Sequence, residues 1–318
     1  MARGGTIATL LVTLWACGAA RAQNQAVSAP SPAPAAGGFV GSNACKVCHA
    51  DIWFNFYKNA HFKSIASGKE PPDRTGCEGC HGPAQAHVAA GGGKNTIPHA
   101  FSLMTPKQVL DTCLRCHATD FNRANIRRSE HTLNDVACTS CHSIHHSPTP
   151  KFLLAKPQRE LCYSCHANIR AQFDMPSKHR VNEGFMECSD CHNPHGSFAA
   201  TWGMGRTRMV EQSLGNEDAC LKCHVDKRGP FVYEHPSVAV EGCEYCHNPH
   251  GSMNAKLLRR PVVFTLCLEC HNGGGSGTRN QGVDIQSARH NLLDPKFQQC
   301  TTCHVRIHGS NADQYFLR

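Results

Sequence analysis

The sequence predicts a chain of short α-helices and long irregular connections, with little β-structure, arranged as five tandem units. The pentapeptide Cys-x-x-Cys-His occurs ten times in the 318 residues and uses every cysteine except Cys17. Histidines outside these motifs recur at similar places in every second motif interval. Few segments alternate apolar and polar residues as a half-buried strand would. Repetition of one motif therefore predicts the architecture better than hydrophobic periodicity does.

The pentapeptide is typical of c-type haem attachment. Residues three and four apart share one face of a helix, so both cysteines can reach one edge of a porphyrin while the histidine lies under the iron. The predicted covalent attachment residues are Cys45, Cys48, Cys77, Cys80, Cys113, Cys116, Cys138, Cys141, Cys162, Cys165, Cys188, Cys191, Cys220, Cys223, Cys243, Cys246, Cys267, Cys270, Cys300 and Cys303. The predicted proximal iron ligands are His49, His81, His117, His142, His166, His192, His224, His247, His271 and His304.

Two other interpretations of the cysteines were weighed. A secreted cysteine-rich chain can be a disulfide scaffold, and paired cysteines can bind zinc. Neither explains why a histidine follows all ten pairs directly. Ten covalently bound haem c groups are the favoured prediction. Because apolar residues are too few for a large independent core, we expect the macrocycles to form it and the chain without haem to be largely disordered.

Twelve histidines lie outside the motifs. In each unit of two motifs, one lies between the motifs and another follows the second motif. The predicted distal iron ligands are His61, His87, His131, His145, His179, His195, His235, His250, His290 and His308. His146 is an alternative to His145, and His99 has no assigned role. The working hypothesis is that the intervening histidine serves the second haem of its own unit and the trailing histidine serves the first.

The predicted organisation is a signal peptide at 1–22, an Ala/Pro-rich linker at 23–41 and a decahaem domain at 42–318. Arg3, an apolar run and a small-x-small site ending at Ala22 indicate the signal peptide. Lipidation at Cys17 is an alternative fate for this leader. The five units are expected at about 43–100, 105–150, 156–200, 216–255 and 261–310.

The formal net charge of +8 does not indicate nucleic-acid binding. Removing the leader would remove Arg3 and Arg21, and each ferric bis-His haem would add about −1 through its propionates. The holoprotein would then carry roughly −4. The basic pairs Arg127-Arg128, Lys227-Arg228 and Arg259-Arg260 are therefore expected to partner propionates. Beyond the leader, no segment has the ~20 apolar residues of a transmembrane helix.

Local signals predict helices that carry the first motif of several units. Thr105-Pro106 offers an N-cap and an N1 proline ahead of Cys113. Asn216-Glu217-Asp218 precedes Cys220, and Lys156-Pro157 precedes Cys162. Asn-Pro-His-Gly follows two of the second motifs, at 193–196 and 248–251, and is typical of a turn. Such turns are expected to place a histidine over a neighbouring iron.

The chain resembles the MtrA/DmsE-type decahaem cytochromes of outer-membrane porin–cytochrome conduits, from Gly41 to the end. Ten motifs in this length carry the resemblance, together with the longer strings TPKQVLDTCLRCH at 105–117, CSDCHNPHGS at 188–197, CLKCHVDKRGPFVYEH at 220–235, CEYCHNPHGS at 243–252 and CHVRIHGSN at 303–311. The resemblance implies a linear array of bis-His haems in a periplasmic protein associated with the outer membrane. It also implies insertion into a β-barrel porin, and exchange with periplasmic electron-transfer proteins and with an outer-surface multihaem cytochrome or an extracellular acceptor or donor.

The residues themselves favour an electron carrier over an enzyme. Enough histidine is present to give every iron two ligands, which leaves no open position for a substrate. The alternatives are a soluble multihaem reductase with one open haem and a free periplasmic electron carrier. Direction is left open between oxidation of extracellular Fe(II) and reduction of metal or another extracellular acceptor.

Overall fold

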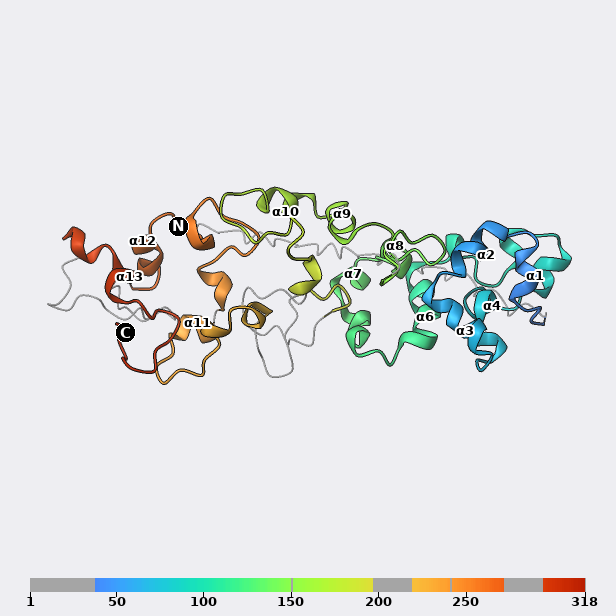
Figure 1. Ribbon diagram of the computed structural model, residues 1–318, viewed down its shortest axis with the longest axis horizontal. Coiled ribbons are helices and arrows are strands. Elements are labelled where there is room, and N and C mark those ends of the chain that lie inside the picture. Colours follow the sequence, from blue (N-terminus) through green and yellow to red (C-terminus); the bar gives the residue numbers. More distant parts are fainter. Residues whose placement is uncertain (1–37, 150, 197–218, 241, 272–293, 318) are drawn as a thin grey trace, which may run out of the picture.

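The computed structural model describes residues 38–149, 151–196, 219–240, 242–271 and 294–317. The predicted signal peptide lies outside these residues, and only the end of the predicted linker is within them. The described chain forms an elongated array in which groups of helices follow one another along the long axis broadly in sequence order (Figure 1). Helices α1 to α4 lie at one end, and α12 and α13 lie at the other.

The regular structure is helical and short, as predicted. The α-helices are α1 Ser42–Lys46, α2 Ala50–Phe56, α3 Lys63–Ser67, α4 Gly76–His81, α5 Gln85–Ala89, α6 Pro106–His117, α7 Glu130–Leu133, α8 Cys138–Cys141, α9 Gln158–Tyr163, α10 Ala167–Gln172, α11 Pro236–Val240, α12 Val263–Leu268 and α13 Cys300–Cys303. Single 3-10 turns lie at Ala60–Phe62, Pro72–Arg74, Lys94–Thr96, Phe101–Leu103, Phe121–Arg123, Ile126–Arg128, Cys188–Asp190, Ala219–Lys222, Val225–Lys227, Cys243–Tyr245, Ala255–Leu257 and Pro295–Phe297. In the described ranges, β-structure is confined to isolated bridges. None of the described helices is both long and apolar enough to cross a bilayer.

Every motif forms one closed helical turn. In eight motifs the histidine N–H donates to the carbonyl of the first cysteine over 2.8–3.0 Å, as in His49 to Cys45 and His247 to Cys243. The other two motifs lie inside α4 and α6. This turn sets both cysteines and the histidine on one side of the backbone, which is the geometry expected from the spacing.

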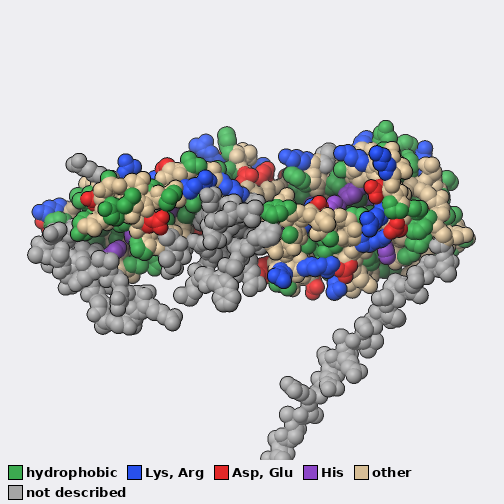
Figure 2. All heavy atoms as spheres, turned by 90° about the horizontal axis from the view of Figure 1, so that it is seen from below, with side chains coloured by type: hydrophobic (Ala, Val, Ile, Leu, Met, Phe, Trp, Pro, Cys, Tyr) green, Lys and Arg blue, Asp and Glu red, His purple; other side chains and the backbone are tan. Residues whose placement is uncertain are grey.

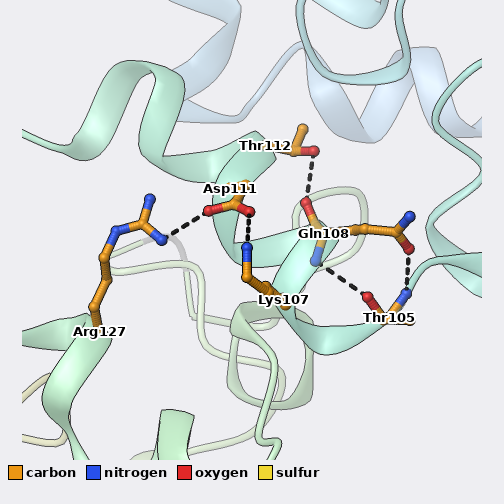
Figure 3. A network of polar contacts seen from close by, with 6 residues as sticks. All are labelled: Thr105, Lys107, Gln108, Asp111, Thr112 and Arg127. Atoms are coloured by element: carbon orange, nitrogen blue, oxygen red, sulfur yellow. Dashed lines mark hydrogen bonds and ion pairs between the residues drawn. The ribbon is translucent and has the colours of Figure 1, made fainter. Parts of the chain in front are cut away.

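Helix α6 begins where the sequence predicts. The Thr105 hydroxyl accepts from the Gln108 N–H, and the Gln108 side chain accepts from the Thr105 N–H in return, while Pro106 occupies N1. Asp111 on the same helix pairs with Lys107 at 3.0 Å and with Arg127 at 2.7 Å (Figure 3). The capping box satisfies two backbone donors at the helix start, which fixes the approach to Cys113. The cap predicted at Asn216-Glu217-Asp218 lies outside the described residues.

Packing between protein side chains alone makes only small local cores. One buried cluster joins Leu110 and Leu114 of α6 to Ile126, with Cys138 packed against it. Eleven described hydrophobic residues are buried in total, which is few for this many residues. Hydrophobic and charged side chains are interspersed over the face seen in Figure 2. The fold therefore rests on connections between units more than on a shared hydrophobic core.

We expect Leu110→Ala to lower the free energy of unfolding by about 2–5 kcal/mol, because Leu110 is buried in this cluster. Leu133→Ala on α7 is the matched control, since Leu133 is 59% exposed. Denaturant unfolding of the holoprotein, followed by Soret absorbance, measures both. Equal effects of the two substitutions would show that the cluster does not stabilise the fold.

Candidate haem sites

Nine motif histidines each face one histidine from outside the motifs. Their ring centres lie 5.9–6.3 Å apart. The facing pairs are His49–His87, His81–His145, His117–His61, His142–His195, His166–His131, His192–His250, His224–His179, His247–His308 and His271–His235.

These separations fit two imidazoles on opposite sides of one metal. With metal–nitrogen bonds of about 2.0 Å, the two ring centres lie roughly 6 Å apart. Each facing pair joins one histidine that follows an attachment Cys-x-x-Cys to one that does not. The residues present therefore fit haem c with two histidine ligands at nine positions, including nine of the ten expected distal ligands.

The facing pairs do not follow the pairing expected within units. His131, between the motifs of the second unit, faces His166 of the third unit rather than His142. His195, which trails the third unit, faces His142 of the second unit rather than His166. The same rule holds along the array. An intervening histidine faces the first motif of the next unit, and a trailing histidine faces the second motif of the previous unit. His87 is the exception and faces His49 of its own unit.

The geometry separates the histidines that sequence spacing left ambiguous. His145 faces His81, whereas the neighbouring His146 points its Nε2 toward Asp51 at 3.8 Å. The Nδ1 of His99 contacts the carbonyl oxygen of Cys80 at 2.9 Å, beside a motif rather than opposite one. His290 lies outside the described residues, and His304 is the motif histidine left without a described facing ring.

Oxygen atoms contact the Nδ1 atoms of many facing histidines, which leaves Nε2 for a metal. On the motif side, His81 Nδ1 lies 2.9 Å from the His99 carbonyl oxygen and His247 Nδ1 lies 2.8 Å from that of Lys256. A hydrogen bond of this kind fixes the tautomer and orientation of a ligating imidazole. Similar neutral partners serve His61, His87, His131, His142, His179, His235, His250 and His304.

Burial favours the neutral imidazole that a metal requires. It lowers the pKa of His195 to about 4, with His142 and Arg123 contributing repulsion. Burial is also the main cause that lowers the pKa of His61, His81, His145, His235, His250 and His308. These rings are thus neutral at neutral pH, as ligands must be.

The loop that carries the trailing histidine of the fourth unit, His250, packs against the third unit. The His179 Nδ1 of the third unit contacts the carbonyl oxygen of Pro249, and Ser177 and Ser252 exchange two backbone hydrogen bonds. Gly251 lies between His250 and Ser252, and a Cβ added to it would lie 1.9 Å from the Gln172 carbonyl oxygen. A glycine is therefore required there so that the loop carrying His250 can approach α10.

Loops after other trailing histidines also pack closely on the previous unit, through different contacts. Gly196 packs on the Asn125 backbone, where an added Cβ would lie 2.9 Å from the Asn125 carbonyl oxygen. Gly309 packs on the Phe231 ring, where an added Cβ would lie 2.1 Å from Cδ2. At the junction of the first and second units, His146 stands where these loops have glycine. There the Asn59 side chain donates to the Ile144 carbonyl and also contacts His61 Nδ1.

Cysteines of consecutive motifs approach one another along the array. The thiols of Cys45 and Cys77 share a hydrogen bond, which raises the pKa of Cys45 and lowers that of Cys77 to about 7. First cysteines also meet within units at Cys113–Cys138, Cys162–Cys188 and Cys267–Cys300. Between units, burial and then repulsion from Cys116, Cys165 and Cys270 raise the pKa of Cys80, Cys141 and Cys246. In these parts of the array, the attachment cysteines of successive motifs therefore lie near one another.

The structure also describes the cysteines, for which zinc and disulfide roles were considered, and the arginines expected to partner propionates. Within the described ranges, no three His, Cys, Asp or Glu side chains cluster as a metal site, and the motif cysteines form no disulfide. Arg127 and Arg260 form ion pairs with Asp111 and Glu269, so the propionate role of these arginines stays a prediction. Arg123 likewise forms an ion pair, with Asp120, although its buried Nε has no hydrogen-bond partner in the described chain.

Comparison with known proteins finds matching families and relatives. The doubled CXXCH motif family matches residues 131–171 and 235–275, and the cytochrome c554 and c-prime family matches 87–143. Multiheme cytochrome MtrA of Shewanella baltica is 34% identical over 276 residues, which cover 85% of this chain and 79% of that protein. High-molecular-weight cytochrome c of Nitratidesulfovibrio vulgaris is 24% identical and covers 85% of this chain but 47% of its own length.

We expect Gly251→Ala to lower the free energy of unfolding by about 1–3 kcal/mol, because the added Cβ meets a backbone carbonyl that cannot move alone. It should also move His250 and produce high-spin iron in the electron paramagnetic resonance (EPR) spectrum. Met253→Ala on the same loop is the control, since Met253 is 72% exposed. A Gly251→Ala protein with wild-type stability and spectrum would contradict the docking role.

Proposed function

The chain belongs to the MtrA-type multihaem c-type cytochromes, and from that membership we propose that it conducts electrons between periplasm and cell exterior through ten haems. It binds haem c through its Cys-x-x-Cys-His motifs and carries electrons rather than catalysing a bond-making reaction. The finer proposal concerns the number of haems, their ligands, their order and the partner that surrounds them.

We assign the twenty motif cysteines to covalent attachment and the ten motif histidines to proximal ligation. The distal ligands are the nine facing histidines, and His290 is assigned to the iron of His304 as the remaining partner. The observation that carries this assignment is that motif and non-motif histidines face each other one to one. Bound haem supplies one-electron chemistry at its iron. Two imidazoles would leave that iron no open position, which disfavours a reductase.

The order of the sites supports a linear path for electrons. In several parts of the array the cysteines of successive motifs lie close together, as Cys45 and Cys77 or Cys113 and Cys138 do within their units. The chain is elongated along the same order (Figure 1). A hydrocarbon core of about 30 Å is too thick for one useful tunnelling step, whereas a row of haems divides it into short hops.

We propose that the protein acts in the periplasm and inserts into an outer-membrane β-barrel porin. Irregular backbone such as the long loops here cannot face lipid, but it can line the polar interior of a barrel. Its other partners would be periplasmic electron-transfer proteins and an outer-surface multihaem cytochrome or extracellular acceptor or donor. A free periplasmic carrier is the competing function, since it would use the same ligand set without a barrel.

Counting low-spin irons tests the ligands. The oxidised protein should contain ten haems by the pyridine haemochrome assay, all low-spin by EPR. His250→Ala should make one of the ten irons high-spin. The double variant with His192→Ala should still affect one iron, because both residues serve it. The control double variant His250→Ala with His308→Ala should affect two. Two irons affected by the first double variant would refute ligation across units.

Electron flow across a vesicle membrane tests the conduit. Vesicles that contain a trapped dye and both this protein and an outer-membrane β-barrel porin of the proposed partner class should exchange electrons with an external reductant. Vesicles with the porin alone or with this protein added outside should not. No more exchange with both proteins than with the porin alone would favour the free carrier, while the haem and ligand assignments would stand.

A further inference from the structure

His117 differs, in the charge of its Nδ1 partner, from the histidines whose Nδ1 contacts are described above. Its Nδ1 lies 2.7 Å from Oδ2 of Asp120, one turn beyond the motif. The Nδ1 partners of the other histidines described above are carbonyl, hydroxyl or amide oxygens, which are neutral. Asp120 also forms an ion pair with the Arg123 guanidinium, so the partner of His117 is a negatively charged carboxylate.

The protonation of this cluster follows from iron ligation. If Nε2 binds iron, Nδ1 must carry the proton and can only donate, so it donates to Asp120. The Arg123 Nη2, which lies 3.0 Å from Nδ1, must then direct its proton to the same carboxylate, with which it forms an ion pair. A carboxylate acceptor raises the basicity of the ligating imidazole more than a neutral oxygen does.

A more basic axial ligand stabilises ferric iron over ferrous iron, because the ferric ion carries one more positive charge. On reduction the iron gains one electron from a neighbouring haem, no bond breaks, and the Nδ1 proton stays between His117 and Asp120. We propose that Asp120 is a potential-setting residue whose hydrogen bond with His117 lowers the reduction potential of the haem attached at Cys113 and Cys116. This inference rests on the proposed ligation by His117 and His61.

The same haem can be observed separately from the rest. The His61 and His117 rings are 89° apart, whereas five facing pairs are within 21° of parallel and three lie between 48° and 61°. Nearly perpendicular imidazoles give ferric low-spin haem an EPR signal with an unusually large principal g value. That signal should separate this iron from the other eight whose facing pairs the structure describes.

The test is a redox titration of the full holoprotein followed at the large-g signal. Asp120→Asn keeps an acceptor for Nδ1 but removes its charge, so the midpoint of this signal should shift upward. Asp120→Glu should restore a midpoint nearer the wild type. Asp111→Asn on α6 removes a carboxylate that binds Lys107 and Arg127 and touches no facing histidine, so it should leave the midpoint unchanged.

Failure of this proposal and failure of the ligand assignment are distinguishable. An unchanged midpoint in Asp120→Asn, with the large-g signal intact, would overturn the role of Asp120 and leave the ligands as assigned. High-spin iron in Asp120→Asn would show that Asp120 holds His117 in place, which also overturns a potential-setting role. Absence of the large-g signal from the wild type, or its persistence in His61→Ala, would overturn the ligand pair itself.

Discussion

The facing of imidazoles from different units is the constraint on which the rest of the structure depends. Protein side chains form only small clusters such as Leu110, Leu114 and Ile126. An iron held by His142 of one unit and His195 of the next would join segments that share little hydrophobic surface. Because metal binding supplies folding free energy in such chains, haem attachment and unit assembly are parts of one process. An isolated middle unit would lack ligands for both of its haems.

The connection between units is made by the short loop that carries the trailing histidine. Only two features of this loop are needed for its docking on the previous unit. The residue before the trailing histidine offers a carbonyl to a histidine of the previous unit, as Pro249 does for His179. The residue after it must be small where backbones meet, as at Gly251. The first junction departs from the pattern with His146, and there the Asn59 side chain connects the two units. The residues around the trailing histidine can therefore differ between junctions while its imidazole still faces a motif histidine of the previous unit.

Sequence reasoning predicted the parts that local geometry determines. The motif turn, the Thr105 cap and the scarcity of strands follow from spacing and backbone preferences that act over a few residues. Spacing also selected the histidines that face the motifs. It could not select their partners, since a histidine three residues past a motif can turn toward its own unit or the previous one. The Asp120 contact with His117 was missed, although an acid three residues beyond a motif on a helical turn is a visible signal.

The two ends of the array differ from its middle, and the difference follows from the proposed ligand rule. Each middle unit contributes one imidazole to the next unit and one to the previous unit, so units could be added in steps of two haems without changing the rule. In the first unit, the trailing His87 instead turns back to His49 over a longer connection. In the fifth unit, the intervening His290 is proposed to serve the second iron of the same unit. With these ligands, an electron entering at either end would meet a haem whose ligands come from one unit, whereas each haem between the ends would join two neighbouring units.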